Sequence, residues 1–202
     1  FIFPSTLAAA VSADFEKDQI NGYPMSFGSR LIDGKGDNII VTDETAASGS
    51  KCLKFIDKPG LSQPFYPFVD YRISRDDSKI ITCDFDVKVE KGGNFWHEWR
   101  DWTVNPYRVG PGIRITNGQL MANNKPLMDV PVGTWIHIKV ICGMGKKANG
   151  TWDLQATVFG QKAQEFKGLK CPFANIKQLT FVGFVSDGEE DGVIYLDNVK
   201  FK

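Results

Sequence analysis

The chain has 202 residues, a length that suits one well-packed domain. Lysine plus arginine equals aspartate plus glutamate at 24 each. The charges are spread along the chain, so they predict neither a nucleic-acid partner nor a membrane partner. No apolar run approaches the roughly 20 residues that a membrane-spanning helix needs. Twenty glycines, ten prolines and fifteen phenylalanines favour many short strands joined by turns.

The first thirteen residues read as a leader or linker. They end in Ala-Val-Ser-Ala, as the remnant of a signal peptide does, but no basic region precedes them. We therefore predict a leader over residues 1–13 and a single domain over residues 14–202. The cysteines lie far apart without a CxxC spacing, which argues against a zinc site. Two disulfides with three pairings and buried free thiols both stay open for Cys52, Cys83, Cys142 and Cys171.

Apolar and polar residues alternate through most of the chain, and helical periodicity is hard to find, which predicts an all-β fold. About ten strands in one domain are too many for a flat open sheet, so we expect a two-sheet antiparallel sandwich. The predicted strands cover residues 38–42, 51–57, 66–73, 79–89, 95–102, 112–115, 119–121, 134–142, 151–158, 178–185 and 193–201.

One strand carries an unusual polar side. In residues 135–142, the isoleucines and a valine alternate with Trp135, His137 and Lys139. An aromatic ring and a histidine on the polar side of a strand indicate a groove or a rim rather than a plain solvent face.

Three of the five tryptophans fall in residues 95–102, together with one of the two histidines and charges of both signs. Alternation sends Phe95, His97, Trp99 and Asp101 to one side of the strand. It sends Trp96, Glu98, Arg100 and Trp102 to the other. We predict that the second set is the ligand face and that at least one tryptophan belongs to the core.

These residue types suit a sugar-binding surface. Flat aromatic faces stack on pyranose rings, and the charged groups hydrogen-bond to hydroxyls or pair with acidic substituents. The following loop, residues 103–112, adds a tyrosine and an arginine. Arg72, Arg75 and Arg114 add donors if they face the same side. The predicted ligand-binding residues are Trp96, Glu98, Arg100, Trp102, Tyr107 and His97. The alternative is that the indoles are core anchors and the charges form cross-strand ion pairs.

The two ends of the chain supply a family resemblance. Asp14-Phe15-Glu16 stands near the start, a Ser48-Gly49 turn enters a strand that ends Leu53-Lys54-Phe55, and the last strand contains Leu196-Asp197-Asn198-Val199. This order resembles the jelly-roll β-sandwich modules of carbohydrate-active proteins, both carbohydrate-binding modules and concanavalin A-like lectins and glucanases. The resemblance covers the two ends and the overall strand pattern, and it implies a concanavalin A-like jelly-roll fold.

The same resemblance implies a structural calcium ion. In many such sandwiches an early glutamate, backbone carbonyls near the Ser-Gly turn and a late aspartate hold calcium, which nominates Glu16 and Asp197 here. Calcium prefers several hard oxygen ligands of this kind. The alternative is that both are ordinary surface or turn carboxylates.

The motifs of related enzymes are incomplete in this chain. The glucanase pattern Glu-x-Asp-x-x-Glu is absent. His97-Glu98-Trp99-Arg100 resembles part of the Arg-x-Glu-x-Arg strand of jelly-roll alginate lyases. The first arginine and the Gln-Ile-His and Tyr-Phe-Lys motifs of that family are missing. A lyase that uses His97 or His137 with Tyr107 is therefore the minority interpretation.

Together these observations predict a non-catalytic carbohydrate-binding or accessory module of an extracellular polysaccharide-processing protein, secreted or cell-surface, with a polysaccharide or oligosaccharide as its partner. Other domains of a longer parent chain are a further expected partner. The first alternative is a polysaccharide lyase or glycoside hydrolase that uses the same face. The second is a structural or protein-interaction sandwich in which all tryptophans are core.

Overall fold

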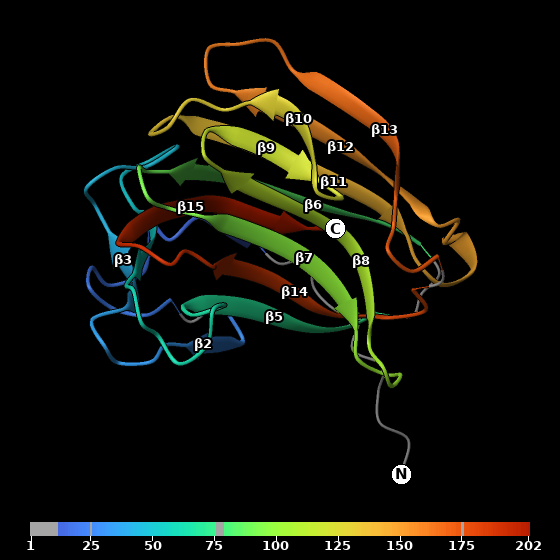
Figure 1. Ribbon diagram of the computed structural model, residues 1–202, viewed down its shortest axis with the longest axis horizontal. Helices are drawn as coiled ribbons and strands as arrows, with labels where there is room; N and C mark the ends of the chain where they lie inside the picture. The colour runs from blue at the N-terminus through green and yellow to red at the C-terminus, as the bar shows by residue number, and fades with distance from the viewer. Residues whose placement is uncertain (1–11, 25, 76–78, 175) are drawn as a thin grey trace.

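The structure is a computed structural model that describes residues 12–24, 26–75, 79–174 and 176–202. Its strands form two layers, with sheet B nearer the viewer than sheet A in Figure 1. Sheet A has the strand order β13-β12-β11-β6-β15-β4-β3, with β1 paired to β15. Its strands are β1 (Ser12–Ala13), β3 (Asn38–Thr42), β4 (Cys52–Asp57), β6 (Ile80–Val89), β11 (Trp135–Gly143), β12 (Thr151–Val158), β13 (Gln164–Lys170) and β15 (Gly192–Phe201).

Sheet B has the strand order β10-β9-β8-β7-β14-β5-β2. Its strands are β2 (Ser29–Leu31), β5 (Phe68–Arg75), β7 (Phe95–Asp101), β8 (Arg108–Thr116), β9 (Gln119–Ala122), β10 (Lys125–Asp129) and β14 (Leu179–Ser186). The strand pairs within both sheets are antiparallel, and strands distant in sequence lie side by side, as β7 and β14 do. The predicted all-β, two-sheet antiparallel jelly-roll sandwich is confirmed.

Four strands of the described residues were not expected from the sequence, and each of the eleven predicted strands overlaps an observed one. Among the four, β10 and β13 are edge strands whose side chains are mostly exposed or half-buried, so they lack the alternation that marks a buried face. Ser12 and Ala13 pair with Lys200 and Val199. The sandwich therefore begins before the predicted boundary at residue 14, and residues 1–11 of the predicted leader lie outside the described residues.

The core lies between the two sheets. Sheet A contributes the inward side of β6, including Phe85 and Val87, and sheet B contributes Phe95 and Trp99 from β7, all of them buried. The four cysteines are free thiols, three of them buried. None of the described residues forms a helix long and apolar enough to cross a membrane.

Candidate functional site

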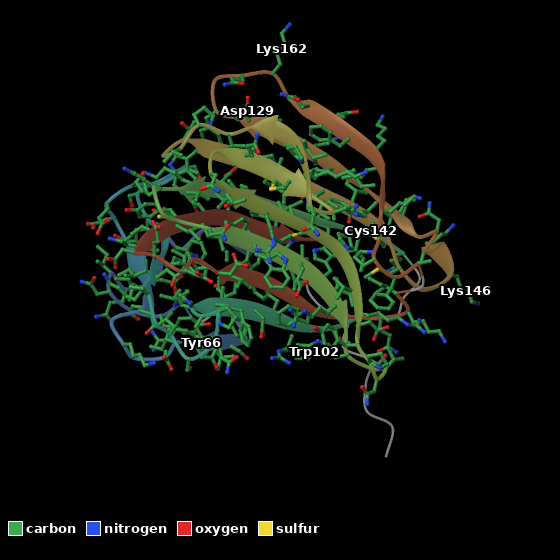
Figure 2. All side chains as sticks on the ribbon, in the orientation of Figure 1. Tyr66, Trp102, Asp129, Cys142, Lys146 and Lys162 are labelled. Carbon is green, nitrogen blue, oxygen red and sulfur yellow. The ribbon has the colours of Figure 1, made fainter. Side chains whose placement is uncertain are left out.

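Burial along β7 follows the alternation expected of a strand with one inner side. The inner side of β7 faces the core, and its residues are buried: Phe95, His97, Trp99 and Asp101. On the other side, Trp96 and Arg100 are half-buried and Glu98 is covered by its neighbours. Trp102, just past the strand, is 38% exposed. Figure 2 shows Trp102 near the end of β7.

The inclusion of His97 among the ligand-binding residues is wrong, because its side chain faces the core. Its Nδ1 lies 2.9 Å from the carbonyl oxygen of Gly183, and its Nε2 accepts a hydrogen bond of 3.0 Å from the indole N–H of Trp99. With one ring nitrogen donating and the other accepting, the imidazole is neutral. Burial lowers the pKa of His97 to about 3. His97 therefore anchors β7 to β14 and does not reach the outer surface.

On the outer face of sheet B, residues of the neighbouring strands β5, β14 and β7 stand opposite one another in rows. Phe181 of β14 stands opposite Arg72 of β5 and Arg100 of β7. In the next row, Gly183 stands opposite Asp70 and Glu98. We call this surface the arginine–aromatic face. Its members are Asp70, Arg72, Trp96, Glu98, Arg100, Trp102, Arg114, Phe181 and Asp187.

Two arginines on this face are each held by a more deeply buried carboxylate. Arg72 Nε donates to Asp70 Oδ1 at 2.8 Å; the Arg72 side chain is 46% exposed and that of Asp70 is fully buried. Arg100 donates to Glu98 in the same way, and again the guanidinium is the more exposed partner. The carboxylates thus lie below the surface and the guanidiniums lie above them.

A third pair extends the pattern to β8. Arg114 donates to Asp187, which follows β14, and its guanidinium carbon lies 4.5 Å from the ring centre of Trp96. In the described part of the chain, the second carboxylate oxygens of Asp70 and Asp187 are buried without a hydrogen-bond partner. Burial raises the pKa of Glu98 and of Asp187, while the neighbouring guanidiniums lower each pKa. The buried carboxylates therefore depend on these arginines for their charge balance.

Aromatic rings surround the Arg100 guanidinium. Its carbon lies 4.8 Å from the ring centre of Phe181, 5.0 Å from Tyr107, 5.7 Å from Trp96 and 6.0 Å from Trp102. These distances are within the range of cation–π attraction. The rings therefore hold the cationic group in a fixed position on the face.

Trp102 and Phe181 form a stacked pair that closes one end of the face. Their ring centres are 4.8 Å apart at an interplanar angle of 25°. The Arg72 guanidinium lies over the same indole, 4.1 Å from its ring centre. The exposed side of this stack is a flat apolar surface beside a cation. Tyr107, 46% exposed on the neighbouring loop, adds a hydroxyl-bearing ring.

A hollow of about 450 Å³ opens on this face beside Trp96. Gly112 stands opposite Glu98 in the register between β7 and β8, and the lack of a side chain there leaves room above the sheet. The hollow is lined by the Trp96 indole, the Arg114 guanidinium and the side-chain amides of Asn123 and Asn124, together with two glycines of β8. Its lining includes Trp96, Glu98, Gly110, Gly112, Arg114, Asn123 and Asn124.

The predicted metal ligands Glu16 and Asp197 each accept hydrogen bonds from the backbone of the loop over residues 47–51, at opposite ends of that loop. Asp197 Oδ2 accepts from the N–H groups of Ala47 and Ser48, at 3.0 and 3.2 Å. Glu16 Oε1 accepts from the N–H groups of Ser50 and Lys51, both at 2.9 Å.

The carbonyls near this loop are also engaged. The Lys51 ammonium donates to the backbone carbonyls of Glu16 and Asp18, at 3.0 and 2.9 Å. Oxygens that accept from N–H donors and from an ammonium do not fit a shared calcium site. Among the described residues, no group of three or more His, Cys, Asp or Glu side chains is placed to hold a metal ion. The hydrogen bonds that these oxygens accept thus do not favour calcium binding by Glu16 and Asp197, which stays an untested prediction.

The catalytic pairing of a histidine with Tyr107 does not form. His97 is enclosed in the core, and His137 lies on the outer side of β11 in sheet A, whereas Tyr107 belongs to the loop that enters β8 of sheet B.

Sequence reasoning missed Phe181 and the buried partners Asp70 and Asp187. Alternation within residues 178–185 groups Phe181 with Gly183 and Val185, but it does not say which side of the sheet they occupy. The side chain of Arg75 lies outside the described part of the structure.

The sequence matches no protein-family model and no curated protein. Solved structures match in fold. An endo-β-1,4-glucuronan lyase from the fungus Trichoderma reesei is similar at 12% identity, over 90% of this chain and 93% of that chain, with a TM-score of 0.64.

The PL-14 alginate lyase of Aplysia kurodai matches at 12% identity over 81% and 86% of the two chains, with a TM-score of 0.55. A carbohydrate esterase from the Shiga toxin-encoding bacteriophage phi24B matches at 13% identity over 83% and 87%, also with a TM-score of 0.55. The chain is a jelly-roll β-sandwich of the kind found in carbohydrate-active proteins, as the resemblance of its two ends implied. At these identities the likeness concerns the fold alone.

Proposed function

We propose that the protein is a non-catalytic module that binds acidic polysaccharides on the arginine–aromatic face. One observation carries this proposal. Three guanidinium groups, Arg72, Arg100 and Arg114, each rest on a more buried carboxylate and lie among aromatic rings. This arrangement presents planar cationic donors and flat apolar surfaces side by side.

The aromatic part of the face suits the apolar sides of sugar rings. Trp102 and Tyr107 are exposed, and the Trp102 indole stacks on Phe181. An indole whose position is fixed by this contact loses little side-chain freedom when a sugar stacks on it, which favours binding. The hollow beside Trp96 adds a recess in which a pyranose can meet Arg114 and two amide side chains.

The arginines favour an acidic glycan over a neutral one. Guanidinium groups bind carboxylates and sulfates through paired N–H donors in one plane. Arg72 and Arg100 stand on strands separated only by β14, and their guanidinium carbons lie 5.6 and 4.8 Å from the ring centre of Phe181 on that strand. Neighbouring cations of this kind suit a polyuronate, which carries a carboxylate on every sugar. Glucuronan and alginate, which two of the structural neighbours cleave according to their names, are polymers of this class.

The absence of catalysis is supported by the placement of the histidines. Both lie away from the arginine–aromatic face, one in the core and one on the other sheet. Proton abstraction from a sugar requires a base within hydrogen-bond reach of the reacting carbon. The carboxylate of Glu98 on this face is buried and paired with Arg100.

A titration of intrinsic tryptophan fluorescence with oligoglucuronate tests this proposal. We expect a saturable change in the wild-type protein. The affinity should be about tenfold weaker in Arg72→Gln, because one charge-assisted contact is lost. Lys162→Gln is the matched control, since Lys162 projects from the loop between β12 and β13 away from this face in Figure 2. Equal weakening in both variants, or no saturable change in the wild type, would refute the proposal.

Tyr107 supports one second candidate, a polysaccharide lyase. Its exposed phenol lies beside Arg100, so an arginine that neutralises a uronate and a tyrosine that moves a proton are neighbours here. Incubation with polyuronates distinguishes the two candidates. A rise in absorbance from unsaturated uronate ends, abolished in Tyr107→Phe, would replace the binding proposal by the lyase. We expect no rise.

A further inference from the structure

The outer face of sheet A carries a separate polar hollow. It has a volume of about 430 Å³ and lies on the neighbouring strands β15, β6 and β11. It includes the polar side of residues 135–142, which the sequence marked as a groove or a rim. Its lining residues are Ser48, Thr82, Asp84, Asp86, His137, Lys139, Asn198, Lys200 and Lys202.

Hydrogen bonds across the three strands hold one wall of this hollow in place. Asp86 accepts from His137 Nδ1 at 2.8 Å and from the side-chain amide of Asn198 at 2.7 Å. The amide oxygen of Asn198 in turn accepts from Ser48 Oγ at 3.0 Å. Asn198 adopts a left-handed backbone conformation, with φ of 53°, where the register between β15 and β6 shifts. Such a bulge redirects the side chains beside it.

Two cationic groups in the hollow, His137 and Lys139, lie close to Asp84. His137 Nε2 lies 3.8 Å from Asp84 Oδ1, and Lys139 Nζ lies 3.8 Å from the same oxygen. These separations permit charge attraction but exceed a hydrogen bond. The neighbouring Asp84 and Asp86 raise the pKa of His137 to about 9, so its ring carries a positive charge at neutral pH.

Positive charge exceeds negative charge around the hollow. His137, Lys139, Lys200 and Lys202 supply four cations, and the lining contains two carboxylates, Asp84 and Asp86. One of these carboxylates, Asp86, is already bound by His137 and Asn198. The excess of cations comes from β11, from β15 and from the residue that follows β15, whereas β6 supplies both carboxylates and the Thr82 hydroxyl.

We propose that this hollow binds a tetrahedral oxyanion, a sulfate or phosphate group that is either free or esterified. Its oxygens accept hydrogen bonds in several directions at once, which suits donors that arrive from three strands. Lys200, His137 and the Thr82 hydroxyl supply one donor from each strand. This site is independent of the arginine–aromatic face, which lies on the other sheet.

The proposal is tested by NMR of the histidine ring signals. The protein is titrated with inorganic sulfate, and separately with phosphate, while the ionic strength is held constant. The chain contains two histidines, and His97 is an internal reference because it is enclosed in the core. We expect a saturable shift of the His137 ring signals and none for His97. An equal shift with chloride would overturn the proposal, because chloride reports general screening only.

Charge variants make the test specific. Lys200→Gln should weaken sulfate binding about tenfold, because it removes one charge-assisted contact, and Lys162→Gln should leave it unchanged. The rise in melting temperature with sulfate is a second readout that should follow the same order. Unchanged affinity in Lys200→Gln would refute the site.

Glucose 6-sulfate and glucose 6-phosphate distinguish the two sources of the oxyanion. Saturable binding of either sugar ester supports a site for an esterified group, and binding of the inorganic ions alone supports a free-ion site.

Discussion

At the residue scale, two tryptophans three positions apart have opposite roles. Trp99 is fully buried and donates to His97, whereas Trp102 is exposed and stacks on Phe181. Alternation in the sequence separates the two sets of side chains in β7, but both sets mix aromatic and polar groups. Composition alone therefore does not show which set is buried. His97 was predicted as a ligand contact from its chemistry, although its position in the alternation places it with Trp99.

Removal of each indole should have a different effect on stability. Trp99→Ala should lower the free energy of unfolding by about 3–5 kcal/mol, because it opens a cavity in the core. Trp102→Ala should lower it by about 1 kcal/mol or less, because the ring is on the surface. Urea denaturation of both variants measures the difference. Equal losses would show that the assignment of inner and outer sides in β7 is wrong.

The two histidines should give opposite dependences of stability on pH. The pKa of His97 is lowered to about 3 from 6.5, so the unfolded chain binds the proton first and stability is lost as the pH falls below 6.5. The pKa of His137 is raised to about 9, so its contribution is complete below pH 6.5 and is lost as the pH rises through 9.

Calorimetric melting of His137→Gln across this range checks the second effect. The variant should lose the decline in melting temperature between pH 6.5 and 9 that His137 causes. It should keep the decline on the acid side, because His97 is unchanged. A decline on the alkaline side as steep as that of the wild type would contradict the assignment.

At the element scale, β14 determines the shape of the arginine–aromatic face. Phe181 folds back over Gly183, and a Cβ at Gly183 would lie 2.6 Å from the Phe181 ring. The sequence predicted this strand, but the position of the ring depends on packing between strands that are distant in sequence. Edge strands β10 and β13 escaped prediction for a related reason, since their exposure removes the alternating pattern.

Gly183→Ala should weaken glycan binding several-fold with the fold intact. The new methyl group displaces the Phe181 ring, which then no longer supports Trp102. A double-mutant cycle with Phe181→Ala identifies the cause. If the glycine acts through the ring, the added substitution should have no further effect on affinity in the Phe181→Ala background. Additive losses would point to another cause.

The loop over residues 47–51 is a second element that carries a testable prediction. The sequence nominated Glu16 and Asp197 as calcium ligands, whereas the structure shows both bound to the backbone of this loop. A chelator should therefore leave the melting temperature unchanged, and Glu16→Gln should lower it, because the neutral amide accepts weaker hydrogen bonds from Ser50 and Lys51. Loss of stability on chelation that added calcium restores would support the metal site instead.

At the scale of the whole molecule, each sheet presents its own outer surface. Sheet B offers arginines among aromatic rings, and sheet A offers lysines and a histidine around two carboxylates. The strand pattern and the two chain ends were sufficient to predict the sandwich. Alternation places Asp70 beside Arg72 and Glu98 beside Arg100, since the members of each pair are two residues apart on one strand. The pair of Arg114 with Asp187 was not predictable, because these residues are distant in sequence and meet only through packing.

A calorimetric titration that compares an acidic glycan with a neutral one tests most directly whether the arginine–aromatic face binds acidic polysaccharides. We expect oligoglucuronate to bind with saturation, and a neutral β-1,4-glucan oligosaccharide of equal length to bind at least about tenfold more weakly. Trp102→Ala should reduce the affinity for oligoglucuronate. The matched variant Phe159→Ala, which removes an exposed ring that follows β12 of sheet A, should retain it. Equal affinity for the two glycans, or undiminished binding by Trp102→Ala, would contradict the proposal.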